Sequence, residues 1–245
     1  MIEVKFAAAH HARALVFVAA LHDTVEQWID GPDGHHLQRV RRLEVDEELI
    51  IADGSGRWYP ARITETRAGG VGTERIGADH TEPQLRPALT IAFAPAKRDH
   101  GSEVVRQLVE LGVDCIIPLA CERSVVRWDG ERGVKALARL RRVVREAAMQ
   151  CHRARVPMVE PPTSIQSLGT EPGLLLGDPE GLAIDTISDP PDDRWVAVIG
   201  PEGGLTPGEL AELASATKVR VGPYVLRSVT APGALAAALA VRRRA

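Results

Sequence analysis

Short apolar runs separated by turn residues dominate the first third of the chain. Residues 14–18, 48–52 and 58–63 are apolar stretches of strand length, and Asp-Gly and Gly-Gly pairs lie between or after them. This punctuation is typical of β-strands in a small barrel or sandwich. Residues His36 to Leu43 contain no helix breaker and predict the one helix of this part. Residues 1–76 are therefore expected to form a compact β domain.

From residue 77 onward the pattern changes to apolar runs that alternate with helical periodicity. Val104, Val105, Leu108 and Val109 recur at helical spacing after Ser102, a good N-cap residue, and Gly112 marks the helix end. A second helix is expected at 134–150. Strands are expected at 89–94, 115–119, 174–176, 196–199 and 219–221. Strands separated by helices indicate an α/β domain with a parallel sheet over 77–245.

The last apolar stretch, Leu235 to Val241, precedes three arginines, Arg242 to Arg244. It predicts a packed C-terminal helix rather than an RNA-binding tail, with the cations complementing the helix dipole.

Composition narrows the class of protein. The chain has 245 residues, 44% of them hydrophobic, and no uncharged apolar run of membrane-spanning length. Its N-terminus lacks the layout of a secretory signal, so a cytoplasmic location is expected, with no membrane partner. The three cysteines, Cys115, Cys121 and Cys151, form no Cys-x-x-Cys pair. They predict plain thiols, and no metal site is expected.

Basic residues are unevenly distributed. The formal net charge is −3, yet residues 121–155 hold ten Lys or Arg and four Asp or Glu, a net charge of +6. A smaller basic cluster lies at 35–42. A solvated helix face and a nucleic-acid surface explain the longer stretch equally well.

Glycine-rich turns follow three of the expected strands, at 176–181, 199–204 and 221–227. Ligands bind outside the carboxyl ends of strands in open α/β sheets, so these turns predict a pocket. Glycine permits a close approach of backbone groups to a flat ligand such as adenine. The sequence Thr206-Pro207-Gly208-Glu209 is also a good helix start, so an ordinary strand-to-helix turn explains 199–209 equally well. Neither a dinucleotide fingerprint nor a phosphate loop occurs.

Residues 199–206, together with Val225-Leu226-Arg227 and Thr230-Ala231, resemble the 16S ribosomal RNA uridine-N3 methyltransferases, a family of the SPOUT class. The resemblance covers nearly the whole chain. Its further matches are Arg13, His35-His36, Glu110-Leu111-Gly112-Val113, Glu122-Arg123-Ser124, Glu146-Ala147-Ala148, Gln150 and Arg153.

The resemblance implies a fold, a cofactor and partners. The fold is a PUA-like RNA-binding β-barrel domain followed by a parallel-sheet SPOUT domain with a C-terminal trefoil knot. The cofactor is S-adenosyl-L-methionine (SAM), held folded by the three turns. The partners are 16S rRNA in the small ribosomal subunit and a second copy of the chain, and the reaction is methylation of a uridine N3.

The resemblance also assigns residues. For the cofactor these are Leu176, Gly177, Ile199, Gly200, Pro201, Glu202, Gly203, Gly204, Val221, Gly222, Leu226, Thr230 and Ala231. For RNA they are Arg13, His36, Arg39, Arg42, Arg123, Arg139, Arg145 and Arg153. Arg227 is the first choice for a catalytic contact, with ion pairing or helix capping as the alternative. Glu202 is a weaker candidate for proton acceptor, because glutamates in such turns more often bind backbone N–H groups.

The chain departs from the family pattern at four positions. Gln107 precedes the Glu-Leu-Gly motif where Lys is usual, Met149 replaces Glu, and Tyr224 and Val229 replace Arg and Glu. These departures affect RNA contact and proton handling, and they keep a non-catalytic RNA-binding assembly factor open as a hypothesis. A SPOUT ribose 2′-O-methyltransferase of rRNA or tRNA is the nearer alternative.

Overall fold

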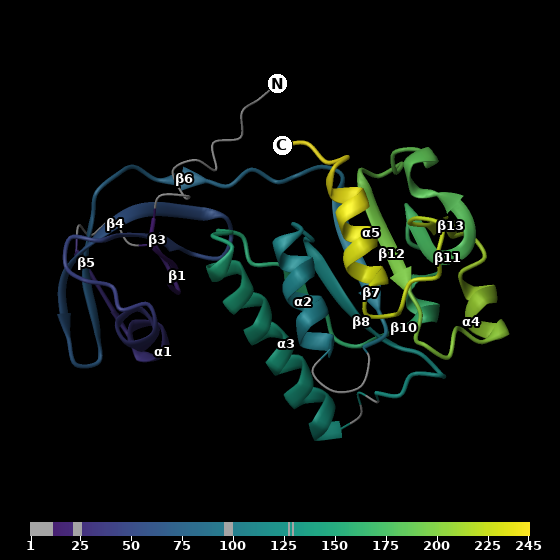
Figure 1. The fold of residues 1–245 in the computed structure, drawn as a ribbon, viewed down its shortest axis with the longest axis horizontal. Coiled ribbons are helices and arrows are strands. Elements are labelled where there is room, and N and C mark those ends of the chain that lie inside the picture. Colours follow the sequence, from purple (N-terminus) through teal and green to yellow (C-terminus); the bar gives the residue numbers. More distant parts are fainter. Residues whose placement is uncertain (1–11, 22–25, 96–99, 127, 129) are drawn as a thin grey trace. The chain divides into compact units, whose positions relative to one another are not determined.

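The computed structural model describes residues 12–21, 26–95, 100–126, 128 and 130–245 (Figure 1). The chain divides into two compact units. One comprises the residues up to 83 and the segment 146–156, and the other comprises 84–145 and 157–245. Within the described ranges, no helix has the length and apolar character needed to cross a membrane.

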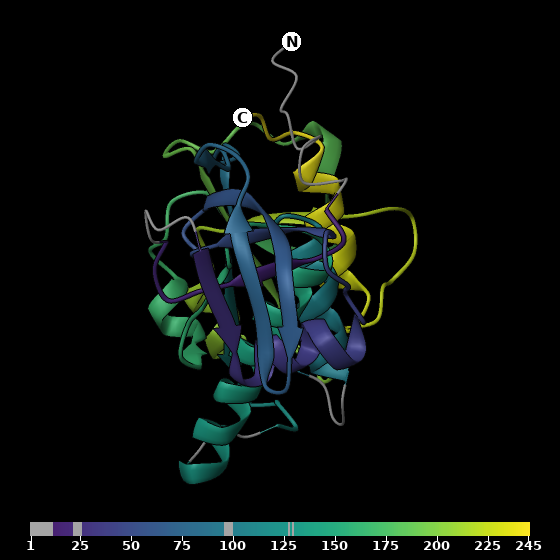
Figure 2. The same cartoon turned by 90° about the vertical axis from the view of Figure 1, so that its left-hand side faces the viewer.

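The first unit is built on one sheet with the strand order β1-β3-β4-β5-β2 (Figure 2). Its strands are β1 (Leu15–Phe17), β2 (Glu26–Asp30), β3 (Glu48–Ala52), β4 (Arg57–Arg67) and β5 (Gly70–Arg75), and β6 (His80–Thr81) pairs with β4. β1 runs parallel to β3, and the other pairs are antiparallel. The three strands expected from apolar runs are confirmed. β2, β5 and β6 escaped prediction because polar residues and glycines interrupt them.

Alternation along the strands places one set of side chains in the core of this unit. Leu49 and Ile51 of β3 and Tyr59 and Ile63 of β4 are at most 1% exposed and pack in one cluster. Val71 of β5 joins them. Burial of this apolar surface is the main stabilising contribution to the sheet.

The helix of the first unit begins earlier than expected. α1 (Gly31–His35) has Pro32 in its first turn, and residues His36–Val40 continue it as one π-helical turn. The prediction of a helix over 36–43 is therefore wrong at both ends. Pro32 is favourable here despite being a helix breaker elsewhere, because its fixed φ suits the first turn of a helix. Arg42 has a φ of 53°, which ends the helical run and turns the buried Leu43 into the core.

The second unit contains a parallel sheet with the order β10-β8-β7-β12-β11-β13, and β9 pairs with β8. Its strands are β7 (Ala88–Phe93), β8 (Cys115–Ala120), β9 (Met158–Val159), β10 (Thr163–Ser164), β11 (Leu174–Ala183), β12 (Arg194–Ile199) and β13 (Thr217–Arg220). All six strand pairings in this sheet are parallel. The expected parallel α/β sheet is confirmed.

Helices accompany this sheet along the chain. They are α2 (His100–Glu110), α3 (Gly130–Gln150), α4 (Pro207–Glu212) and α5 (Ala231–Ala240), with the 3-10 turns η2 (Ile165–Leu168) and η3 (Ile184–Thr186). The apolar stripe of α2 is buried, with Val105, Leu108 and Val109 at 0% exposure. Gly112 follows α2 with a φ of +79°, as its predicted role as a helix stop requires. α5 packs on α2, β7 and β12.

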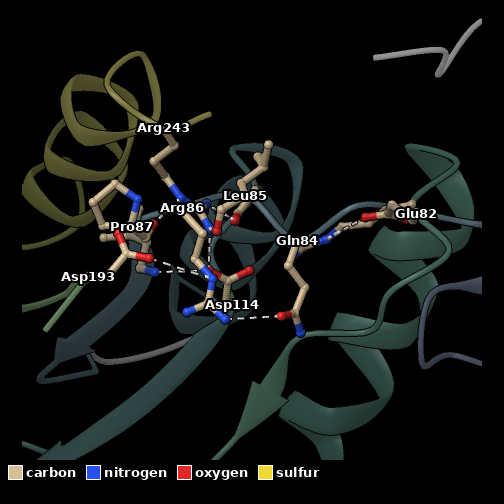
Figure 3. A network of polar contacts seen from close by, with 11 residues as sticks. Glu82, Gln84, Leu85, Arg86, Pro87, Asp114, Asp193 and Arg243 are labelled. Carbon is tan, nitrogen blue, oxygen red and sulfur yellow. Dashed lines mark hydrogen bonds and ion pairs between the residues drawn. The ribbon is translucent and has the colours of Figure 1, made fainter. Parts of the chain in front are cut away.

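The arginines after α5 have a different role from the expected one. The Arg243 side chain is fully buried and donates hydrogen bonds to the carbonyl oxygens of Pro87 (2.7 Å) and Leu85 (3.1 Å) (Figure 3). It also pairs with the Asp114 carboxylate. Arg242 pairs with Asp189 at 2.9 Å. The packed helix is confirmed, but Arg242 and Arg243 after it bind other segments of the unit rather than only complementing a dipole.

Candidate cofactor pocket

A pocket of about 390 Å³ opens where β11, β12 and β13 end. Three chain segments contribute to its lining: 176–179 within β11, 199–205 from the end of β12 onward, and 219–228 from the end of β13 onward. Leu210 and the α5 residues Ala231 and Leu235 complete the wall. The three segments that the sequence pattern singled out therefore line one cavity. The turn expected at 176–181 is wrong, because this segment stays within β11 as an irregularity where the pairing with β13 shifts between Gly177 and Leu182.

Most of the residues assigned to the cofactor line this pocket. They are Leu176, Gly177, Ile199, Gly200, Pro201, Glu202, Gly204, Val221, Leu226 and Ala231. Gly203 and Gly222 lie in the same turns but do not line it, and neither does Thr230, the N-cap residue of α5. Thr230 instead borders a separate groove between α2 and α5, together with the unusual residues Gln107 and Val229.

The glycines of the 199–204 turn serve the protein's own packing. A Cβ on Gly200 would lie 3.1 Å from Cγ of Leu205, and a Cβ on Gly203 would lie 3.3 Å from Cβ of Arg123. Gly204 has a φ of +70°, which favours glycine. Two of these glycines thus make room for neighbouring side chains, a reason different from the close ligand approach that the sequence suggested.

The helix start at Thr206 is present as well. The Thr206 hydroxyl accepts a hydrogen bond from the Glu209 N–H at 3.3 Å, and Oε2 of Glu209 accepts one from the Thr206 N–H at 2.8 Å. This reciprocal pair is a capping box that begins α4. The strand-to-helix turn is therefore confirmed, and part of the same segment also forms a wall of the pocket.

Glu202 bridges two of the pocket turns. It is exposed, and its Oε1 accepts a hydrogen bond of 2.6 Å from the Ser228 hydroxyl. Both residues line the pocket. The expectation that Glu202 binds backbone N–H groups is not met by this bond, whose donor is a side-chain hydroxyl.

Arg227 lies beside the pocket without lining it. Its side chain is exposed, and its carbonyl oxygen accepts hydrogen bonds from the N–H groups of Thr230 and Ala231, both at 2.9 Å. The backbone of Arg227 thus fixes the start of α5, while the residue is exposed to solvent.

One charged pair at the pocket was not anticipated. Asp178, which lines the pocket, pairs with Lys218 at 3.0 Å and accepts a 2.9 Å hydrogen bond from the Glu180 N–H. The bond from Glu180 and then Lys218 lower the pKa of this carboxyl, so it is charged at neutral pH. Its position directly after the apolar run 174–176 was the signal that could have revealed it, because the pairing of β11 becomes irregular there.

The predicted RNA contacts of the first unit are on its surface. Arg13 is 68% exposed and pairs with Glu47 at 2.7 Å. Arg39 and Arg42 are exposed, and His36 is half-buried. Arg153 is different, because its side chain is only 10% exposed and lies 3.9 Å from Glu82.

Basic residues of α3 are also exposed. Arg139 and Arg142 are exposed on α3, and Arg145 is half-buried, whereas Leu140, Val143 and Val144 are buried. Arg123 precedes α3 and donates hydrogen bonds to the carbonyl oxygens of Gly203 (3.1 Å) and Leu205 (3.5 Å). It therefore contacts the pocket wall directly.

The three cysteines are free thiols, as predicted. Burial raises the pKa of Cys115 to about 12. Burial, followed by the nearby Glu209, raises the pKa of Cys121 to about 11. Both thiols are protonated at neutral pH and are therefore poor nucleophiles.

Comparison with known proteins gives consistent matches over both parts of the chain. A family model described as an RNA methyltransferase domain matches residues 83–240, and one described as an RNA methyltransferase PUA domain matches residues 29–71.

Named relatives cover nearly the whole chain. A Mycobacterium bovis protein named ribosomal RNA small subunit methyltransferase E is 34% identical over 239 residues, which are 93% of this chain and 91% of that protein. The Bacillus subtilis protein of the same name is 28% identical over 83% of this chain and 85% of its own length. The structure of the Neisseria gonorrhoeae protein of that name, bound to S-adenosyl methionine, aligns with a TM-score of 0.81 and 28% identity over 94% of this chain and 97% of that chain.

Proposed function

Since this chain belongs to the family of the ribosomal RNA small subunit methyltransferases E, we propose that it transfers a methyl group from SAM to 16S rRNA. The acceptor atom is N3 of a uridine. The observation that carries the proposal is the convergence of three separate segments on one pocket: the irregular part of β11 and the turns after β12 and β13.

The residues of this pocket suit SAM. Leu176, Ile199, Leu205, Val221 and Leu226 give it an apolar lining that fits a flat adenine ring. The backbone of the glycine-containing turns offers N–H and C=O groups at the adenine edge. Asp178 adds a carboxylate that suits the ribose hydroxyls or the ammonium group. When bound, SAM supplies the methyl group.

The chain's own residues would prepare the uracil. Transfer to N3 requires the loss of the imide proton and stabilisation of charge on the flanking carbonyl oxygens, which positioned cations achieve. The exposed guanidinium of Arg227 is the proposed contact to a uracil oxygen or to the adjacent phosphate. Glu202 is the secondary candidate for proton acceptor. In that role it would release the Ser228 hydroxyl or accept the proton at its second oxygen.

RNA would be bound by basic side chains in both units. Arg13, His36, Arg39 and Arg42 belong to the first unit, and Arg139 and Arg145 to the second, whereas Arg123 is hydrogen-bonded to the pocket wall. The side chain of Arg153 is largely buried, so less of it can contact RNA. Such contacts to phosphate position RNA without reading its sequence. We further propose a homodimer that works in the cytoplasm on the small ribosomal subunit, with the three turns forming the trefoil knot of the family.

The experiment that tests this function is methylation of purified small subunits and of naked 16S rRNA with labelled SAM, followed by nucleoside analysis. We expect N3-methyluridine as the product. Label on a ribose 2′-oxygen would identify the 2′-O-methyltransferase alternative instead. If the protein bound RNA but neither held SAM in calorimetry nor transferred label, it would be a non-catalytic assembly factor.

A further inference from the structure

The loop that follows β8, residues 121–124, is bonded to the pocket turn 199–206. We infer that Glu209, assisted by Arg123, is a positioning residue that holds this turn in its cofactor-binding shape. The inference rests on the proposed SAM site. It assigns to Glu209 a role beyond starting α4, and to Arg123 a role other than RNA binding.

The carboxylate of Glu209 is buried and fully engaged. Its residue is 8% exposed, and its two oxygens accept hydrogen bonds from two different segments. Oε2 accepts from the Thr206 N–H at 2.8 Å, and Oε1 accepts from the Glu122 N–H at 2.9 Å. Burial of a carboxylate is unfavourable unless such bonds compensate for the lost hydration, so this placement depends on both segments being in position.

The bond to Glu122 is not part of helix capping. A capping box needs only the bonds between Thr206 and Glu209, which stay within one helix start. Glu122 is 87 residues away in the sequence and belongs to the loop after β8. Oε1 of Glu209 thus connects the loop after β8 to the pocket turn.

Arg123 makes a second connection between the same two segments. Its Nη1 donates to the carbonyl oxygens of Gly203 (3.1 Å) and Leu205 (3.5 Å). Gly203 has no side chain, and a Cβ there would lie 3.3 Å from Cβ of Arg123. The turn is therefore shaped to receive Arg123, and the adjacent Leu205 lines the pocket. Fixing this wall before the ligand arrives lowers the entropic cost of binding.

The test is the variant Glu209→Gln with Glu212→Gln as its matched control. Glutamine has the size of glutamate, but only one of its two terminal atoms is an acceptor. It can therefore keep the hydrogen bond from Thr206 or the one from Glu122, but not both. Glu212 is an exposed acid on the same short helix. For each protein we would measure the SAM Kd by calorimetry, the Kd for naked 16S rRNA, and the melting temperature without ligand.

We expect Glu209→Gln to raise the SAM Kd about tenfold, as the loss of a bond between a charged group and a buried donor would, and to change the RNA Kd less than twofold. Glu212→Gln should match the wild type. A Glu209→Gln protein that melts earlier but binds SAM normally would overturn the inference, because Glu209 would then stabilise the fold without shaping the pocket.

Arg123→Ala decides the question if Glu209→Gln does not fold, because Arg123 is exposed. A raised SAM Kd with an unchanged RNA Kd in Arg123→Ala supports the inference. A raised RNA Kd with an unchanged SAM Kd contradicts the inference and would show that Arg123 binds RNA instead. If the wild type bound no SAM, the proposed function itself would fail, and that result is distinct from either outcome.

Discussion

Two walls of the pocket differ in how firmly the rest of the protein holds them. The turn 199–206 is bonded to Arg123 and Glu209, and its Pro201 is buried. The turn 221–228 is open by comparison, since Tyr224 is 83% exposed and Val225 is 77% exposed. Gly222 has a φ of +77° with nothing within 4 Å of an added Cβ.

From this difference we expect the fixed wall to bind the cofactor and the open wall to bind the RNA substrate. A wall fixed in advance suits a cofactor of constant shape, because little ordering entropy is lost on binding. A wall with exposed side chains suits a large substrate that approaches from solvent, because those side chains gain their contacts only when it arrives. A substitution in the fixed wall should therefore change SAM affinity, and one in the open wall should change methyl transfer or the KM for RNA.

The largest effect is expected from Arg227→Ala in the open turn. Methyl transfer in single-turnover assays should fall about 100-fold, because a cation beside the developing negative charge is lost. The SAM Kd in calorimetry should not change, since Arg227 does not line the pocket. Arg227→Lys should recover part of the rate, because it restores charge without the planar fork. Full activity of Arg227→Ala would remove this residue from the mechanism.

Tyr224→Ala should have the next largest effect. Tyr224 is the aromatic side chain among the described residues that line the pocket, and an unstacked base can stack on it. Its loss should raise the KM for RNA about tenfold, consistent with the energy of one base stacked on an aromatic ring. Tyr224→Phe is the control and should behave as wild type. A changed SAM Kd in Tyr224→Ala with a normal KM for RNA would show that the open wall also serves the cofactor.

Gly200→Ala and Gly222→Ala compare the walls directly. The new methyl group at 200 presses on Leu205, which lines the pocket, so the SAM Kd should rise about fivefold. The methyl group at 222 meets open space, and its left-handed backbone should instead lower the free energy of unfolding by about 1 kcal/mol. Calorimetry and thermal melting separate the two effects. If Gly200→Ala and Gly222→Ala raised the SAM Kd equally, the two walls would not differ in how firmly they are held.

The smallest effect is expected from Ser228→Ala, which removes the hydrogen bond that the Ser228 hydroxyl donates to Glu202 across the two walls. Because Glu202 is exposed, water can replace the hydroxyl, and the SAM Kd should rise only about twofold. If Ser228→Ala lowered the methyl-transfer rate as much as Arg227→Ala does, the Ser228–Glu202 pair would take part in proton transfer. Glu202→Gln with normal turnover would exclude Glu202 as the base.

The sequence alone determined the elements with strong periodicity and the location of the pocket. Apolar runs such as 89–94 and 115–119 are strands because they are buried on both faces of a parallel sheet, and this burial makes them continuous in sequence. The turns at 176, 199 and 221 could be grouped because parallel strands end at one edge. β2 and β5 were missed because their burial depends on neighbouring strands rather than on their own composition.

Only the tertiary structure decided what the individual residues contact. The reason for a glycine at 203 is Arg123, 80 residues earlier in the chain, and the partner of Glu209 Oε1 is a backbone N–H 87 residues away. Likewise the burial of Arg243 depends on carbonyl oxygens more than 130 residues before it. Sequence periodicity reports local geometry and average burial. Contacts between distant segments follow from how strands and loops assemble, which no local pattern encodes.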